Sequence, residues 1–200
     1  MNKKKIIFKE IFGWTVSIVF AIVIAVVVDT KVFAAVEVKQ SSMENTLYQG
    51  QKLITEKISY DFTSPKSGDI IIFLEDKYKN NYADELNIFR EDVENQLNLN
   101  SNGNTRLVKR VIGVPGDEID LKDGSVYING KKLNEVYVTS KTFKEDMNFP
   151  IKVPNGKLFV LGDNRQVSRD SRSFGLIDNK QVDGKVVVRI WPLSKIGKVK

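Results

Sequence analysis

The chain has 200 residues, a formal net charge of +6, and neither histidine nor cysteine. These absences exclude an imidazole base, a thiol nucleophile and disulfide bonds, and they remove the usual ligands of zinc and redox metals. The charge does not indicate a nucleic-acid partner, because the lysines alternate with acidic residues and form no basic stripe interleaved with aromatics. We therefore expect no metal, no cofactor and no nucleic acid. A hydroxyl activated by an amine is the main option left for covalent catalysis.

The first thirty residues differ from the rest of the chain. Several lysines precede an apolar run without charge, Ile11–Val28. As a helix this run would be about 27 Å long, which is enough to span a bilayer core. We expect residues 10–30 to form a single transmembrane anchor. By the positive-inside rule, residues 1–9 would lie in the cytoplasm and residues 31–200 would form an extracytoplasmic domain at the cell membrane.

A cleaved secretory signal is the alternative for this segment. Val32-Phe33-Ala34 resembles a cleavage site with small residues on either side of a larger one. However, the apolar run is longer than the hydrophobic part of most secretory signals, and the polar Asp29-Thr30-Lys31 separates it from that site. The uncleaved anchor is therefore the favoured interpretation.

Short strands separated by turn residues follow the anchor. The predicted strands are alternating or β-branched apolar runs, namely Val36–Val38, Lys52–Ile54, Asp69–Leu74, Arg106–Ile112, Lys157–Leu161 and Lys185–Trp191. Hairpin turns are predicted at Lys122-Asp123-Gly124 and at Asn129-Gly130, the latter a strong hairpin signal. The pattern predicts a mainly β domain with a sandwich or barrel-like architecture.

The stretch from about 75 to 105 interrupts this rhythm of strands. Its apolar residues recur every three or four positions, as on one face of a helix, at Tyr82, Leu86, Phe89, Val93 and Leu97. We expect a helical insertion between two strands of the core, with the apolar stripe covering the sheet. A binding role for the insertion is the alternative.

Four motifs in fixed order carry the functional information. They are Ser42-Met43 with Thr46-Leu47, then Ser67-Gly68-Asp69 with the apolar run that follows, then Lys109-Arg110-Val111-Ile112-Gly113 with Pro115-Gly116-Asp117, and last Gly162-Asp163-Asn164-Arg165 with Ser168-Arg169-Asp170-Ser171-Arg172. Together with the N-terminal anchor they resemble type I signal peptidases, the membrane-bound serine proteases that remove signal peptides from exported proteins. The resemblance is to the single-anchor form typical of Gram-positive bacteria, and it covers the chain except for the insertion.

This resemblance implies that Ser42 is the nucleophile and Lys109 the general base. A lysine with a solution pKa near 10.4 is protonated at neutral pH, so Lys109 must be desolvated before it can accept a proton. Its neighbours in the sequence, Leu107 and Val111 among them, are apolar. Ser41 competes as nucleophile, but alternation along an extended segment would turn it away from the face that holds Ser42.

The resemblance also implies a set of supporting residues. Ser168 corresponds to a serine that hydrogen-bonds the lysine amine and orients it. Asp170 and Arg172 correspond to an ion pair that shapes their loop, and Arg110 corresponds to an arginine that pairs with an acid, here Asp163. We expect these residues to position the reacting groups and not to take part in the chemistry.

Two positions depart from the family pattern. Gln40 stands where the family commonly has serine or glycine, and its amide is a candidate donor to the oxyanion beside the backbone N–H of Ser42. Asn45 stands where proline is usual, so we expect a less rigid turn after Ser42. Both departures leave the serine and the lysine in place.

The implied fold is a signal-peptidase-type β ectodomain on one N-terminal helix. Its partners would be preproteins bearing signal peptides, bound as an added strand with small residues before the cut, together with membrane lipid and the secretion machinery. The alternative is a non-proteolytic, anchored relative that binds or chaperones secreted subunits. The presence of both Ser42 and Lys109 argues against it. A nucleic-acid-binding barrel would need an aromatic stacking platform, which the sequence lacks.

Overall fold

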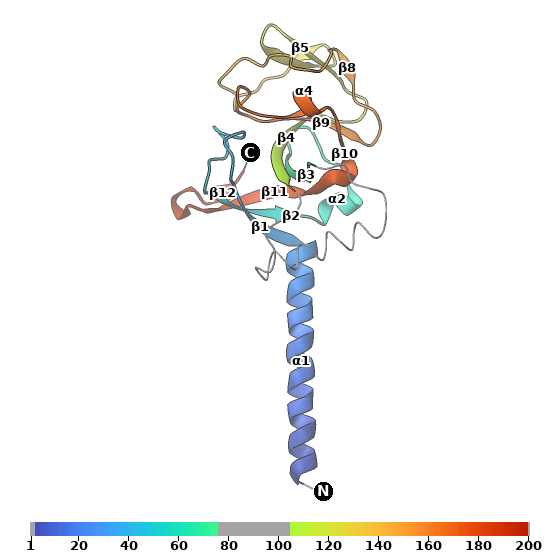
Figure 1. The fold of residues 1–200 in the computed structure, drawn as a ribbon, viewed down its shortest axis with the longest axis vertical. Coiled ribbons are helices and arrows are strands. Elements are labelled where there is room, and N and C mark those ends of the chain that lie inside the picture. Colours follow the sequence, from blue (N-terminus) through green and yellow to red (C-terminus); the bar gives the residue numbers. More distant parts are fainter. Residues whose placement is uncertain (1–2, 76–104, 200) are drawn as a thin grey trace.

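The computed structural model describes residues 3–75 and 105–199, with side chains described except at residues 3–8, 26–31 and 61. A long helix, α1 (Lys3–Lys31), leads into a domain built mainly of antiparallel strands (Figure 1). Only Val32 separates α1 from the first strand, β1 (Phe33–Glu37), and the carbonyl of Val32 accepts a hydrogen bond from Lys57 N at 3.0 Å. Within the described residues, no helix is both long enough and apolar enough to cross a membrane.

The larger sheet forms the body of the domain. Within the described residues its strand order is β1-β2-β11-β3-β4-β9-β10, with β12 pairing at β11. After β1, its strands are β2 (Lys52–Glu56), β3 (Ile70–Leu74), β4 (Arg106–Gly113), β9 (Lys157–Leu161), β10 (Ile177–Asp178), β11 (Val182–Trp191) and β12 (Gly197–Lys198). These strands confirm the predicted mainly β domain. Every residue of β3 is buried, as its unbroken apolar sequence predicts for a strand covered on both faces.

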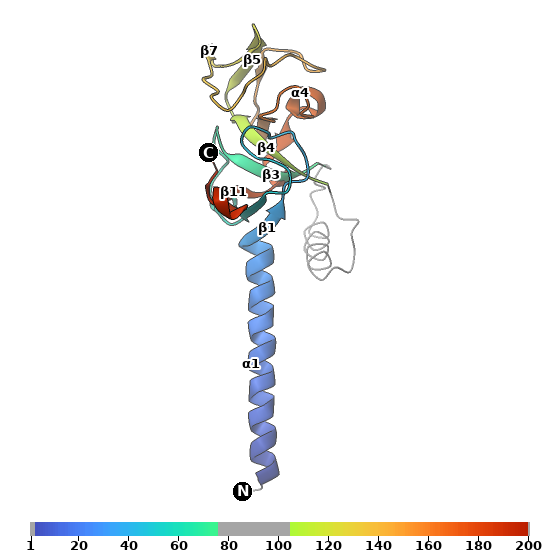
Figure 2. The same cartoon turned by 90° about the vertical axis from the view of Figure 1, so that its left-hand side faces the viewer.

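A smaller sheet lies at the end of the domain farthest from α1 (Figures 1 and 2). It has the order β7-β6-β5-β8 and consists of β5 (Glu118–Lys122), β6 (Ser125–Ile128), β7 (Lys131–Lys132) and β8 (Ile151–Lys152). Both predicted hairpin turns are present. Asp123 and Gly124 have φ of 54° and 73°, and Asn129 and Gly130 have φ of 52° and 77°. Positive φ at both central residues matches the right-handed twist of the flanking strands.

Short helical segments complete the described fold, and the sequence did not predict them. They are α2 (Ser59–Phe62), α4 (Ser171–Phe174), η1 (Asn179–Gln181) and η2 (Leu193–Lys195). A helix of one turn is too short to show a hydrophobic period, so its formation depends on local capping. In α4 the cap is Asp170, whose side chain accepts a hydrogen bond from Arg172 N.

The predicted helix of the insertion lies outside the described residues, but the two ends of the insertion are described. Leu74 at the end of β3 pairs with Arg106 at the start of β4, and Glu75 N donates to the carbonyl of Thr105 at 2.9 Å. The insertion therefore leaves and re-enters the sheet at neighbouring positions, as a connection between two antiparallel strands.

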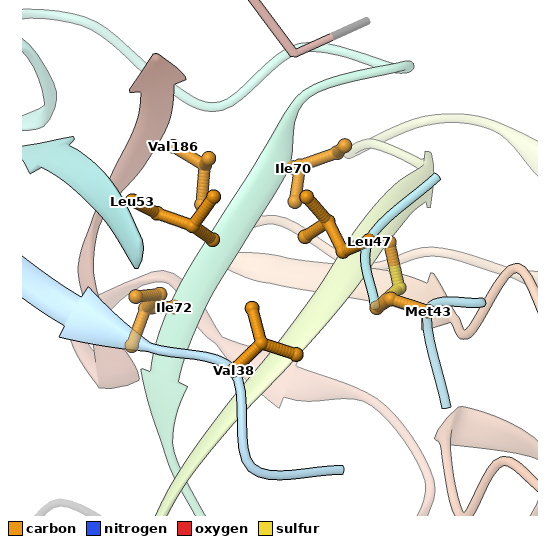
Figure 3. Close-up of a cluster of buried hydrophobic side chains, with 7 residues drawn as sticks. All are labelled: Val38, Met43, Leu47, Leu53, Ile70, Ile72 and Val186. Carbon is orange, nitrogen blue, oxygen red and sulfur yellow. The ribbon is translucent and has the colours of Figure 1, made fainter. Parts of the chain in front are cut away.

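The core consists of three clusters of buried apolar side chains along the sheets. One of them lies beside the segment that follows β1 and is formed by Val38, Met43, Leu47, Leu53, Ile70, Ile72 and Val186 (Figure 3). Met43 and Leu47 enter this cluster from a turn, while the other members come mostly from strands. The cluster thereby fixes the turn that contains Ser42 against the sheet.

Candidate active site

The Ser42 turn, residues 42–46, is held by two apolar residues, Met43 within it and Leu47 directly after it. Met43 and Leu47 are almost completely buried in the core cluster of Figure 3. Ser42 is 8% exposed, whereas Ser41 is exposed, so Ser41 is turned away from the site as predicted. The reason differs from the predicted strand alternation, because the segment is a turn in which Ser42 and Met43 are both buried. Burial of Met43 and Leu47 fixes the backbone that carries Ser42.

Lys109 approaches this hydroxyl from the middle of β4. That strand lies between β3 and β9, and the Lys109 side chain is only 1% exposed. Its Nζ lies 2.8 Å from Ser42 Oγ and 3.2 Å from the carbonyl oxygen of Val108. The predicted contact between serine and lysine is therefore present, and it joins residues 67 positions apart in the sequence.

The surroundings of Lys109 favour its neutral form. Burial lowers the pKa of the amine from its ordinary value of 10.5 to about 8, while the charges of Asp170 and Asp163 raise it in part. Desolvation is the largest cause because an ammonium group loses more hydration energy than a neutral amine when it leaves water. An amine with this pKa is partly deprotonated close to neutral pH, which is what a general base requires.

Arg110 and Asp163 form the predicted ion pair beside the turn. Arg110 Nε and Nη2 donate to the two carboxylate oxygens of Asp163 at 2.9 Å and 2.7 Å, a bidentate geometry. Thr46 Oγ1 donates to the same carboxylate at 2.5 Å. The pair thus connects β4, the loop after β9 and the Ser42 turn. The sequence did not predict the contribution of Thr46.

Asp170 and Arg172 also form their predicted pair. Arg172 Nε and Nη2 lie 2.8 Å and 2.9 Å from the Asp170 carboxylate, and the same guanidinium donates to the carbonyls of Arg165 and Ser168. Asp170 in turn accepts a hydrogen bond from Gly162 N at 3.1 Å. The polar loop is therefore closed on itself by buried, satisfied charges.

The expected hydrogen bond from Ser168 to the lysine amine is not made. Ser168 is buried, but its hydroxyl has no hydrogen-bond partner among the described residues. The Lys109 amine instead has Ser42 Oγ and the Val108 carbonyl as acceptors. Ser168 lies beside the site nevertheless, because its Oγ and the carbonyl oxygen of Ser42 both occupy the space that a Cβ on Gly162 would need.

Gly162 and Asn164 are further site residues, which the sequence alone did not single out. The absence of a side chain at Gly162 allows Ser168 and the backbone of Ser42 to approach each other. Asn164 N donates to the Ser42 carbonyl at 3.1 Å, and Asn164 Nδ2 donates to the Ser41 carbonyl at 3.3 Å. Both stand in the Gly-Asp-Asn-Arg motif, and this motif is the sequence signal that could have identified them.

The two departures from the family pattern lie at the rim of the site. Gln40 is exposed, two positions before Ser42. Asn45 has φ of +81°, a left-handed conformation that proline cannot adopt and that asparagine tolerates. Its side-chain amide donates to Thr139 Oγ1 at 3.1 Å and to the Tyr137 carbonyl at 3.4 Å. These bonds tie the turn to a distant segment, while its rigidity relative to a turn with proline stays a prediction.

The charged and polar groups of this site fit acyl transfer by an activated hydroxyl. A buried hydroxyl faces an amine whose pKa is lowered, which is the arrangement needed to activate an oxygen nucleophile for acyl transfer. No group of three or more acidic side chains in the described parts of the chain is arranged to hold a metal ion.

The family described as "Signal peptidase, peptidase S26" matches residues 11–191. This chain belongs to that family. Signal peptidase IB of Staphylococcus aureus is 34% identical to it over 203 residues, covering 94% of this chain and 93% of that protein. A protein of Synechocystis described as "Probable signal peptidase I-2" is 36% identical over 181 residues, covering 90% of this chain and 73% of the relative. The crystal structure of a signal peptidase I from Enterococcus faecalis aligns with a TM-score of 0.43 and 29% identity, covering 62% of this chain and 97% of the other.

Membership of this family defines the activity. The chain is a serine endopeptidase, a hydrolase that removes signal peptides, and its substrates are preproteins that carry them. The non-proteolytic alternative is not favoured.

Proposed function

We propose that this signal peptidase uses Ser42 as its nucleophile and Lys109 as its general base. The observation that carries the proposal is the 2.8 Å contact between Lys109 Nζ and Ser42 Oγ, made by an amine that burial holds at a pKa of about 8. Because the chain has no histidine and no cysteine, neither an imidazole base nor a thiol nucleophile can take the place of this pair.

In the proposed reaction the neutral Lys109 amine takes the Ser42 proton as Oγ attacks the carbonyl carbon before the cut. The oxyanion that forms is stabilised by the backbone N–H of Ser42 and by the Gln40 side-chain amide. Lys109 then gives its proton to the leaving amine, and an acyl-enzyme remains. A water molecule deprotonated by Lys109 hydrolyses this ester and restores Ser42.

The remaining polar groups are proposed to position this pair. Arg110 with Asp163, and Arg172 with Asp170, fix the two loops that meet at the site. Once Ser42 is acylated, its oxygen belongs to an ester, and the Lys109 amine needs a new partner to stay oriented. The hydroxyl of Ser168, which has no hydrogen-bond partner in the described part of the chain, is suited to that role because it lies against Gly162 beside the Ser42 backbone.

We also propose that residues 10–30 anchor the enzyme in the cell membrane. The charge-free run Ile11–Val28 in the sequence extends past Ala25, the last residue of this run whose side chain is described. Along the described part of α1, large apolar side chains such as Phe12 and Trp14 are exposed on all sides, as in a helix surrounded by lipid. Residues 1–9 would then be cytoplasmic, residues 31–200 would be extracytoplasmic, and the secretion machinery would deliver the preprotein.

A trapped acyl-enzyme tests the assignment of the nucleophile. On acid quenching during cleavage of a synthetic signal-peptide substrate, we expect the enzyme to carry the mass of the N-terminal fragment, and peptide mapping should locate it at Ser42. Ser42→Ala should show neither adduct nor cleavage, while Ser41→Ala should show both. An adduct on Ser41, or cleavage by Ser42→Ala, would show that another residue is the nucleophile.

The lowered pKa of Lys109 predicts the pH dependence. Only the neutral amine can accept the Ser42 proton, and its fraction increases as pH rises through the pKa of about 8. We therefore expect kcat/KM to rise about tenfold per pH unit below that value and to level off above it. Steady-state kinetics on a signal peptide between about pH 6 and pH 10 measure this, with thermal unfolding over the same range as control. A kcat/KM that does not change across this range would rule out lysine as the base.

A further inference from the structure

We propose that Tyr137 is a positioning residue of this peptidase, which holds the Ser42 turn in place from a segment that contains none of the reacting groups. The segment, residues 135–142, lies between β7 and β8 and has no regular secondary structure; we call it the strap. The proposal rests on the roles of Ser42 and Lys109 given above. It concerns how the hydroxyl of Ser42 is kept within reach of the amine.

The ring of Tyr137 covers the ion pair that binds the Ser42 turn. Arg110 Cζ lies 3.9 Å from the centre of the ring. The same guanidinium binds the Asp163 carboxylate with two hydrogen bonds, and that carboxylate accepts the hydroxyl of Thr46 in the Ser42 turn. An aromatic face over a guanidinium attracts it and excludes water from its edge, so the charge pair beneath is stronger.

The backbone of the strap binds the turn at a second point. Asn45 Nδ2 donates to the carbonyl oxygen of Tyr137 and to Thr139 Oγ1, at 3.4 Å and 3.1 Å. Asn45 is the residue of the turn with a left-handed backbone. Two bonds to its side chain therefore act on the part of the turn where the chain reverses, three residues after Ser42.

The strap is itself fastened to the loop on the other side of the site. Glu135 forms an ion pair with the guanidinium of Arg165, at 2.5 Å and 3.2 Å, and Thr142 Oγ1 accepts from the same group at 2.5 Å. Arg165 is one of the most deeply buried side chains in the structure, and its Nε donates to the Gly162 carbonyl at 2.9 Å. The Tyr137 hydroxyl completes the connection by donating to Glu135 at 3.1 Å.

The exposure pattern of the strap supports a polar holding role. Val136, between Glu135 and Tyr137, is 86% exposed, while its two neighbours point inward. A segment that served only to cover the core would bury its valine and expose its glutamate. The strap instead exposes Val136 and turns Glu135 and Tyr137 inward. Glu135 contacts Arg165 and Tyr137 contacts Arg110.

The test compares Tyr137→Leu with Tyr137→Phe in the full-length enzyme on a signal-peptide substrate. Leucine keeps bulk but removes the aromatic face, so we expect kcat to fall about tenfold with KM within about twofold of wild type. Phenylalanine keeps the face over Arg110 and should restore most of kcat.

Tyr127→Leu removes a similar contact, with Lys122 at 4.6 Å in the small sheet, and should leave kcat unchanged. A wild-type kcat in Tyr137→Leu, a change confined to KM, or an equal loss in Tyr137→Phe would each overturn the proposal.

A double-mutant cycle decides the question if Tyr137→Leu does not fold. Asn45→Gly keeps the left-handed backbone and removes the amide, and Thr139→Val removes the acceptor while keeping the shape. Thr139→Val should lower kcat by roughly threefold, as expected for one exposed hydrogen bond, and Asn45→Gly should lower it further because it also loses the bond to the Tyr137 carbonyl. The double variant should be no slower than Asn45→Gly alone. Losses that multiply would show that the two residues do not act through a shared bond and would overturn the proposal. Ser42→Ala in parallel separates the two hypotheses, because cleavage by that variant would refute the nucleophile and not the strap.

Discussion

Replacement of Lys109 by arginine should abolish signal-peptide cleavage while leaving the protein folded. The guanidinium keeps a positive charge and the ability to donate a hydrogen bond to Ser42 Oγ, but it does not lose its proton in any accessible pH range. The serine proton would then have no acceptor. We expect kcat/KM to fall on the order of 10⁴-fold or more, as when the base of other serine proteases is removed.

The measurement is single-turnover cleavage of a signal peptide over about pH 6 to 10. Thermal unfolding and the acid-quenched acyl-enzyme assay should accompany it. A folded variant without adduct at any pH supports the assignment, since even strong base would not deprotonate the arginine. Lys185→Arg is a suitable control, because Lys185 pairs with Asp69 at 2.6 Å and an arginine can make the same ion pair. If Lys109→Arg kept measurable turnover with a normal pH profile, another group would have to be the base.

Gly162→Ala should be the most damaging of the small substitutions. The added methyl carbon would lie 2.1 Å from Ser168 Oγ and 2.4 Å from the Ser42 carbonyl oxygen, both too close, and the second of these atoms belongs to backbone that cannot rotate away. Either the loop after β9 or the Ser42 turn must shift. A displacement of about 1 Å in a reacting group can lower a rate 10²-fold, so we expect at least that loss in kcat.

The matched control for this substitution is Gly13→Ala in α1, where no described atom lies within 4 Å of the position that a Cβ would take. It adds the same methyl group without contact and should leave kcat unchanged. Steady-state kinetics and thermal unfolding of both variants separate lost positioning from lost stability. Wild-type kcat in Gly162→Ala would show that the loop yields without moving Ser42, and that close approach at this glycine is not needed.

The strands could be predicted because their signals are local. Alternation, β-branched runs and the turns at Asp123-Gly124 and Asn129-Gly130 each depend on a few neighbouring residues. The contact between Ser42 and Lys109 could be predicted because both lie in motifs of one family, and the structure has their atoms 2.8 Å apart.

The strap could not be predicted, because its contacts join segments that have no local relation. Arg165 is separated from Glu135 by 30 positions, and nothing in a polar loop indicates that its guanidinium is buried. The same holds for Tyr137 over Arg110, since a single tyrosine between β strands is more often an ordinary surface residue. The predicted hydrogen bond of Ser168 was wrong for a related reason. Which acceptor a buried amine binds depends on how distant segments pack, and here Ser42 Oγ and the Val108 carbonyl accept from it.

The junction between α1 and β1 contains no linker segment. A tether of several residues would allow the catalytic domain to tilt and swing over the end of the helix. Here Val32 alone intervenes, and the hydrogen bond from Lys57 N to its carbonyl joins it to the residue after β2. The distance of Ser42 from the end of α1 is therefore set by β1 and residues 38–41, and not by a long linker. If α1 is the membrane anchor proposed above, this short connection would hold Ser42 at a nearly constant distance from the membrane, and with it the position at which a passing chain is cut.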